Sequence, residues 1–471
     1  MNNPNQYELC AGWLPNNPVI GSMYVERTRG AEVISFEYDL TWLKTHPNLI
    51  LDPDIIPSIG RQYPSGGRSS FGFLDDISPD RWGRRLIERR ERLDAVTEHR
   101  PVRTLLGSDF LLEVHDGGRL GGIRIRQNGL YLSNREDLAA PPMEYLRKLQ
   151  DAAWNYENHS SDEDKWIRML IAPGSSLGGA RPKANLKDAD GSIWIAKFPS
   201  RHDEINIGAW EMVTHDLAKI CGLDVPEAAI CRLSENGSTF LTKRFDRDGE
   251  SRIHFASAMT MLSETDNSEK VRSYLDIADT LDRYGCSPQS DSKQLFRRVL
   301  FNILVSNTDD HLRNHGFLLQ PNDTWKLSPA YDINPSLDKD HLSLTIDGQS
   351  CEKDISLVIA TADYYGYTKS EAEELAQTMQ NVISQNWRLL AEKYALSRSE
   401  REYMAPAFAE AERNIAISVT TRDVPPGMDE NGLVTDLRAH LAYLSEKKKT
   451  DKSDDHTSID RRKKHDENPE R

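Results

Sequence analysis

Hydrophobic and polar positions alternate with a period of two in the first part of the chain. Ile34, Phe36 and Tyr38 are separated by single polar residues, a pattern that predicts a half-buried strand. Ser78-Pro79 then provides an N-cap followed by proline at the first helical position, and this pair predicts a helix over residues 80–92. That helix is rich in arginine, which is typical of a solvated surface and also compatible with anion binding.

The middle of the chain combines short apolar runs with one helical stretch. Residues 193–198 read as a strand, and residues 206–220 read as a helix that is stopped by glycine and proline. Two further apolar runs at 228–233 and 238–245 flank Asn236-Gly237. Asn-Gly between apolar runs is a strong hairpin signal, so we expect these two strands to pair.

Helical periodicity dominates after residue 290. Apolar residues recur along one face of 295–304, and the runs 317–319 and 325–327 resemble a hairpin. Thr368 and Glu371 form a capping box that predicts the start of a long helix. Strands therefore precede helices in the chain, which favours the α+β class.

We expect the 471 residues to divide into several domains, because one hydrophobic core rarely grows past about 300 residues. The pattern suggests a β-rich N-terminal subdomain at 1–160, a sheet-containing part at 161–245 and a helical domain at 246–445. Residues 446–471 are almost entirely charged or polar and contain one large apolar residue, Ile459. We expect this tail to be disordered because it cannot bury a core.

Composition narrows the function classes. Lys and Arg number 59 against 74 Asp and Glu, giving a net charge of -15. This argues against a protein that coats nucleic acid by itself, so we expect DNA contact only indirectly, through a partner. The five cysteines show no CxxC pair, which fits a reducing cytoplasm. No apolar run approaches the roughly 20 residues that span a bilayer, so we expect no membrane partner.

A loop of small residues is the first candidate for chemistry. Residues 175–183 read Ser-Ser-Leu-Gly-Gly-Ala-Arg-Pro-Lys. Small residues let backbone N–H groups approach phosphate oxygens, and Lys183 adds positive charge. The loop lacks the GxxxxGK[ST] pattern of a Walker A motif, and on its own it could equally be a structural turn.

A lysine within an apolar strand is the second candidate. Lys197 alternates with Ile195, and a lysine is unexpected on a buried face. It could be a solvent-facing residue, or a cation directed at the phosphates of a nucleotide. Glu211, on the following helix, could pair with Lys197 and hold it extended, although by itself Glu211 could be an ordinary surface carboxylate.

Two acidic segments complete the pattern. Asp309 and Asn314 are five residues apart, directly after the apolar helix, and this equals the spacing of the HRDxxxxN catalytic loop of protein kinases. Asp332 follows the predicted hairpin, where a kinase places its DFG aspartate, although this chain reads Asp-Ile-Asn. Taken singly, each segment could be a polar turn. Their order along the chain predicts a two-lobed protein-kinase-like fold and phosphoryl transfer.

In these motifs, the sequence resembles the HipA family of serine/threonine kinases, the toxins of type II toxin–antitoxin modules. The resemblance extends over about 20–440 and is looser in the N-terminal part. The matching segments are Ser176-Leu177-Gly178-Gly179-Ala180-Arg181-Pro182-Lys183, Ala196-Lys197-Phe198-Pro199, Gly222-Leu223-Asp224-Val225-Pro226, Arg244-Phe245-Asp246-Arg247, Asp309-Asp310-His311 with Asn314, and Tyr331-Asp332.

The resemblance implies a set of site residues. It makes Asp309 the catalytic base and Asn314 and Asp332 the ligands of Mg²⁺. The residues it implies for binding ATP are Gly178, Gly179, Ala180, Arg181, Lys183, Lys197, Glu211, Lys243, Arg244, Phe245 and His311. Lys243 to Phe245 would meet adenine, and Ser176 would be the site of autophosphorylation. Asp310 stands where the family often has a small residue, so two adjacent carboxylates compete for the role of base.

The resemblance also implies a substrate and a protein partner. The known targets of the family are aminoacyl-tRNA synthetases, and the partner is a HipB-like helix-turn-helix antitoxin that binds operator DNA. Two alternatives stay open. One is a catalytically weak, kinase-like corepressor that acts by binding the antitoxin. The other is a metal-dependent phosphohydrolase or nuclease that uses Asp309, Asp310, His311 and Asp332.

Overall fold

The computed structural model describes residues 5–28, 30–134, 140–158, 169–170, 179–266, 268 and 270–413. The predicted tail at 446–471 lies outside the described residues, as do Ser176 and Gly178 of the small-residue loop. Within the described ranges, no helix is long and apolar enough to cross a membrane.

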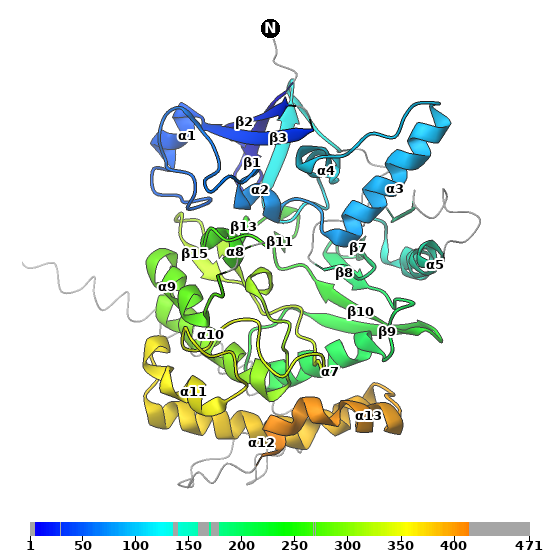
Figure 1. The fold of residues 1–471 in the computed structure, drawn as a ribbon, viewed down its shortest axis with the longest axis vertical. Coiled ribbons are helices and arrows are strands. Elements are labelled where there is room, and N and C mark those ends of the chain that lie inside the picture. The colour runs from blue at the N-terminus through cyan, green and yellow to red at the C-terminus, as the bar shows by residue number, and fades with distance from the viewer. Residues whose placement is uncertain are drawn as a thin grey trace, which may run out of the picture.

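An antiparallel sheet of six strands forms the N-terminal part of the fold (Figure 1). Its order is β4-β3-β2-β1-β5-β6. The strands are β1 (Gln6–Ala11), β2 (Val19–Thr28), β3 (Ala31–Tyr38), β4 (Arg61–Gln62), β5 (Ile123–Gln127) and β6 (Leu130–Tyr131). Ile34, Phe36 and Tyr38 of β3 are all buried, which confirms the strand expected from their alternation.

Four helices accompany this sheet. They are α1 (Leu40–Thr45), α2 (Gly72–Asp76), α3 (Arg81–Thr97) and α4 (Gly107–Glu113). The prediction of a helix over 80–92 is confirmed by α3, which continues to Thr97, but the expected cap at Ser78-Pro79 is wrong because the helix begins after Asp80. Asp80 is its N-cap and accepts a hydrogen bond from the Gly83 amide at 2.7 Å.

A second antiparallel sheet, ordered β7-β8-β10-β9, follows in the chain. Its strands are β7 (Lys183–Lys187), β8 (Ile193–Lys197), β9 (Ala228–Ser234) and β10 (Gly237–Lys243), and the helices beside it are α5 (Leu146–Glu157) and α7 (Ile207–Ile220). The predicted hairpin is confirmed, since β9 pairs with β10 around Asn236-Gly237. In Figure 1, α7 runs below β9 and β10 and separates this sheet from the terminal helices.

The remaining described residues are mainly helical. The helices are α8 (Ala258–Met261), α9 (Tyr274–Tyr284), α10 (Pro288–Leu304), α11 (Ile355–Ala360), α12 (Lys369–Lys393), α13 (Arg398–Met404) and α14 (Ala409–Glu412). The predicted hairpin consists of β14 (Gly316–Leu319) and β15 (Trp325–Leu327), with β13 (Phe255–Ser257) on the other side of β14. Thr368 and Glu371 form the expected capping box at α12.

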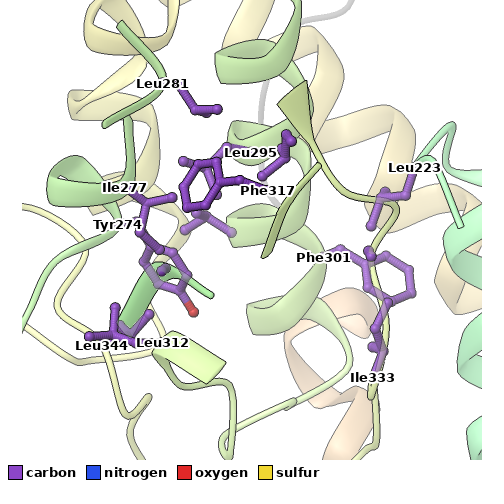
Figure 2. Close-up of a cluster of buried hydrophobic side chains, with 14 of the residues drawn as sticks. Leu223, Tyr274, Ile277, Leu281, Leu295, Phe301, Leu312, Phe317, Ile333 and Leu344 are labelled. Atoms are coloured by element: carbon purple, nitrogen blue, oxygen red, sulfur yellow. The ribbon is translucent and has the colours of Figure 1, made fainter. Parts of the chain in front are cut away.

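The hydrophobic core of this helical part lies directly beneath the predicted catalytic segments. Figure 2 shows Phe301 of α10 beside Ile333, the residue that follows Asp332. In the same view, Leu312, from the loop between Asp309 and Asn314, lies beside Tyr274. Both acidic segments are therefore anchored by a buried apolar side chain within or next to them.

A buried charge network joins the N-terminal part to the rest of the chain. We call Asp116, Arg244, Asp246, Arg247 and Arg252 the junction network. Asp246 pairs with Arg244 at 2.6 Å and with Arg247 at 2.7 Å, while Arg252 pairs with Asp116 at 2.9 Å. The predicted strand 238–245 ends earlier, at Lys243, because the Arg244 side chain turns into this network.

Candidate active site

Lys197 lies between two carboxylates at the end of β8. Its Nζ atom is 2.5 Å from Oε1 of Glu211, on α7, and 2.6 Å from Oδ1 of Asp332. The pairing of Lys197 with Glu211 that we considered from the sequence is therefore present. Asp332 lies 135 residues further along the chain, so this contact joins the sheet to the helical part.

Lys197 and Asp332 stabilise each other's charged form, whereas burial raises the pKa of Glu211 despite the nearby Lys197 ammonium. Burial disfavours the ammonium form of Lys197, but Asp332 and Glu211 outweigh that effect and raise its pKa. Burial would likewise raise the pKa of Asp332, yet the nearby Lys197 ammonium lowers it to about 2. At neutral pH the Asp332 carboxylate is therefore ionised, the form needed to bind a cation.

The backbone around Asp332 is fixed from two sides. Asp332 itself has φ of 57°, in the left-handed region that residues other than glycine adopt at a cost. The next residue, Ile333, is buried, and its carbonyl accepts a hydrogen bond from Thr214 Oγ1 of α7 at 2.6 Å. These contacts hold a strained conformation that directs the carboxylate towards Lys197.

The adjacent aspartates Asp309 and Asp310 have opposite surroundings. The Asp309 side chain is 77% exposed and pairs with Lys339 at 3.3 Å. Asp310 is buried, and its Oδ2 accepts hydrogen bonds from Tyr274 Oη, Asn302 Nδ2 and His315 Nε2, each at 2.8 Å. Of these two carboxylates Asp309 is the one open to solvent, which favours it over Asp310 as the candidate base.

The described part of the small-residue loop is also held by ion pairs. Lys183 Nζ is 2.7 Å from Oδ2 of Asp80, the N-cap of α3, and Arg181 pairs with Asp203 through two bonds of 2.6 and 2.8 Å. Gly179 has φ of 87°, a conformation that glycine adopts without strain. The loop therefore turns sharply beside two cations that are already paired with carboxylates.

Most of these side chains line one cleft, which has a volume of about 530 Å³. Predicted site residues in its lining are Gly179, Arg181, Lys183, Lys197, Glu211, Asp309 and Asp332. The described residues that were predicted but do not line it are Ala180, Lys243, Arg244, Phe245, His311 and Asn314. Residues more than 100 positions apart in the sequence thus surround one space.

The adenine-binding prediction needs one correction. The Arg244 side chain is buried in the junction network and also donates to the carbonyls of Gly118 and Arg119, at 2.7 and 3.0 Å. Because these contacts direct it away from the cleft, the side chain serves the junction and not a nucleotide. The Phe245 ring lies 5.4 Å from that of Tyr331, and the adenine-binding roles of Phe245 and Lys243 stay predictions.

Comparison with known proteins agrees with this architecture. The family described as HipA-like C-terminal domain matches residues 175–387. A Haemophilus influenzae protein named "Putative kinase" is 29% identical over 34% of this chain and 52% of its own length. The Shewanella oneidensis serine/threonine-protein kinase toxin HipA is 27% identical over 34% of this chain and 43% of its own length.

Residues 175–387 of this chain belong to the family of HipA-like C-terminal domains. A solved chain from the Shewanella oneidensis complex of HipA, HipB and operator DNA superimposes with a TM-score of 0.56 at 19% identity. That match covers 86% of this chain and 95% of the other, and it confirms the predicted α+β, kinase-like fold. The sequence matches span only 38% to 52% of the curated relatives' own lengths.

Asn314 and His311 lie in the predicted catalytic loop but do not line the cleft. Asn314 is buried, and its Nδ2 donates to the Asp309 carbonyl at 3.4 Å. Nδ1 of His311 is buried without a hydrogen-bond partner among the described residues. Their roles towards Mg²⁺ and ATP stay predictions.

Two further residues of this site were not identified from the sequence. Asn334 donates from Nδ2 to Asp332 Oδ1 at 3.2 Å, while its buried Oδ1 accepts no hydrogen bond from any described residue. Strand alternation could not have signalled it, because Asp332 lies in the left-handed region and not in extended backbone; its nearness to Asp332 in the sequence was the available signal. Lys339, the partner of Asp309, carried no local signal.

Proposed function

We propose that this protein is an ATP- and Mg²⁺-dependent serine/threonine protein kinase. One observation carries the proposal: the Lys197 ammonium lies between Glu211 and Asp332 in the same cleft that Asp309 lines. Protein kinases use a strand lysine, a helix glutamate, a base aspartate and a metal-binding aspartate in this combination. The names of the relatives support the kinase class.

In the proposed reaction, a serine or threonine hydroxyl of the substrate protein attacks the γ-phosphorus of ATP. A bond forms between the hydroxyl oxygen and this phosphorus as the bond to the β,γ-bridging oxygen breaks, and that electron pair leaves with ADP. Asp309 orients the hydroxyl and accepts its proton. Because a carboxylate is a weak base, alignment and charge neutralisation provide most of the acceleration.

We expect a magnesium ion to be held by oxygen atoms from the Asp332 segment and the predicted catalytic loop. Asp332 and Asn314 are the predicted ligands, and the unpartnered Oδ1 of Asn334 adds a buried oxygen next to Asp332. Mg²⁺ prefers oxygen ligands and takes only one or two carboxylates from the protein. When bound, the ion would neutralise negative charge on the phosphate oxygens of ATP.

The biological part of the proposal follows the family. We propose that the protein acts in the cytoplasm as the growth-arresting toxin of a toxin–antitoxin module, with an aminoacyl-tRNA synthetase as its substrate and Ser176 as its autophosphorylation site. A HipB-like antitoxin would be its partner and would supply the contact with operator DNA. The structural match to a chain of a complex that contains HipB and operator DNA supports this partner.

The phosphohydrolase alternative loses its main support. It required Asp309, Asp310, His311 and Asp332 to act as one cluster, but Asp310 is turned into the core. Among the described residues, no group of three or more His, Cys, Asp or Glu side chains is arranged to hold a metal ion. The corepressor alternative predicts nucleotide binding without turnover.

A radiolabelled phosphate-transfer assay tests the proposal. The purified protein is incubated with Mg²⁺ and γ-labelled ATP, beside Asp309→Ala and Asp332→Ala. We expect labelled phosphate to be incorporated into the protein itself or into an added aminoacyl-tRNA synthetase. In both variants the rate of this incorporation should fall by about 10³-fold or more. Asp340→Ala is a matched control, because Asp340 is an exposed aspartate of the same segment outside the cleft lining. Undiminished incorporation in both cleft variants would end the proposal.

A further inference from the structure

The basic side chains that line the cleft pair with different carboxylates. Four of the described residues in the lining are basic: Arg181, Lys183, Lys197 and Lys339. The first three pair with carboxylates that take no part in the proposed proton transfer, namely Asp203, Asp80, and Glu211 with Asp332. Lys339 differs from them because its carboxylate partner is Asp309, the proposed base.

The contact between Lys339 and Asp309 is open to solvent. Lys339 Nζ lies 3.3 Å from Asp309 Oδ1 and 3.4 Å from Ser343 Oγ, with 41% of the lysine side chain and 77% of the aspartate side chain exposed. Exposed ion pairs of this kind are weak. Lys339 can therefore exchange its partner for a more highly charged anion at little cost.

The backbone around Lys339 is fixed against the loop that carries Asp309. Ser336 N donates to the Ser306 carbonyl at 3.0 Å, and Ser343 Oγ donates to the Thr308 carbonyl at 2.8 Å. These bonds fasten the segment on both sides of Lys339. The lysine is consequently held beside the base although it lies 30 residues further along the chain.

The catalytic loop itself supplies no such cation. Between Asp309 and Asn314 its one arginine or lysine is Arg313, which forms two bonds of 2.9 Å to Asp266. Transfer of a phosphoryl group needs positive charge next to the γ-phosphate oxygens, where negative charge is spread in the transition state. Lys339 lines the cleft beside Asp309, the proposed base that orients the attacking hydroxyl.

We propose that Lys339 binds the γ-phosphate of the nucleotide and stabilises its charge during transfer. The inference rests on the proposed kinase function. Lys339 makes and breaks no covalent bond, and it keeps its own protons. As its ammonium moves to the phosphate, Oδ1 of Asp309 becomes available to the substrate hydroxyl.

Nucleotide affinities test this role independently of activity. Binding of Mg²⁺–ADP and of a non-hydrolysable Mg²⁺–ATP analogue is measured by calorimetry for the wild type, Lys339→Met and Lys339→Arg. Because only the analogue has a γ-phosphate, we expect Lys339→Met to leave the affinity for ADP unchanged and to lower the affinity for the analogue about tenfold. Transfer should slow by about 10²-fold, and Lys339→Arg should recover part of both losses.

Lys353→Met is the matched control. Lys353 Nζ donates to Ser306 Oγ at 3.1 Å, next to the same loop, but lies outside the cleft lining. We expect this variant to bind both nucleotides like the wild type. Equal ratios of ADP to analogue affinity in the wild type and Lys339→Met would overturn the role of Lys339 and leave the kinase proposal standing. A wild type that binds neither nucleotide would overturn the kinase proposal itself.

Discussion

The junction network and the cleft both contain many charged side chains. They differ in how many hydrogen-bond and ion-pair partners each side chain has. In the junction network, Asp246 is buried, pairs with Arg244 and Arg247, and also accepts a hydrogen bond from the Gly121 amide at 2.7 Å. In the cleft, Asp309 is mostly exposed with one weak partner, and Asn334 Oδ1 has no described partner.

This difference separates structural charge from functional charge. A buried carboxylate that receives several hydrogen bonds has no capacity left for a ligand, and its role is to hold two parts of the chain together. A group with an open position can still bind a substrate or an ion. The number of charges in a sequence segment therefore does not locate a site; the unsatisfied positions do.

The largest effect on stability is expected at the junction network. Asp246→Ala would leave Arg244 and Arg247 buried without their carboxylate, and we expect a loss of about 3–5 kcal/mol in the free energy of unfolding. Chemical denaturation followed by fluorescence measures it. Asp248→Ala is the control, because Asp248 is exposed on the neighbouring strand β11 (Arg247–Asp248). Equal stability of the two variants would mean that Asp246 does not hold the junction together.

A smaller but clear loss is expected from Asp310→Ala. Removing this carboxylate leaves Tyr274 Oη, Asn302 Nδ2 and His315 Nε2 without their shared acceptor. We expect about 3 kcal/mol of destabilisation, measured by thermal and chemical unfolding. If Asp310 were instead exposed to substrate, its replacement would leave the unfolding midpoint unchanged.

Acid should lower the stability of the folded protein, because a buried histidine lies where the N-terminal part packs against the following part of the chain. His254 is fully buried, stacks on Trp13 at 4.8 Å, and burial lowers its pKa to about 3. Because the unfolded histidine takes up a proton near pH 6.5 and the folded one does not, stability should fall as the pH drops from about 6.5 towards 3. We expect a loss of about 2 kcal/mol between pH 7 and 5.

Comparing His254→Phe with His202→Gln tests whether His254 causes this pH dependence of stability. Phenylalanine keeps the aromatic stacking and cannot take up a proton, so its stability should vary less over this pH range. His202 is exposed, and its replacement should leave the pH dependence of the wild type. An unchanged slope in His254→Phe would assign the acid sensitivity to another group.

The smallest effect on stability is expected at Asp309. Its exposed pair with Lys339 is worth about 0–1 kcal/mol, so Asp309→Ala should unfold within about 0.5 kcal/mol of the wild type. The same variant should lose phosphate transfer. A large drop in stability would mean that Asp309, like Asp246, serves the fold.

Local patterns predicted many of the elements. The alternation at Ile34, the Asn236-Gly237 turn and the Thr368–Glu371 capping box each depend on neighbouring residues, and each appears as expected. The pairing of Lys197 with Glu211 was also considered, because both lie on elements close in sequence. Arg244 was misassigned because its partners, Gly118 and Arg119, lie more than 100 residues away.

The sequence by itself determined the elements of this protein, their order and the residue types available for phosphate chemistry. Only the tertiary structure decided that Asp309 faces the cleft while Asp310 faces the core, and that Lys339 lies beside the base. Hydrogen bonds within a turn or a cap join residues a few positions apart and can be read locally. The exposure of a carboxylate and the partner of a cation depend on segments that meet only when the chain is folded.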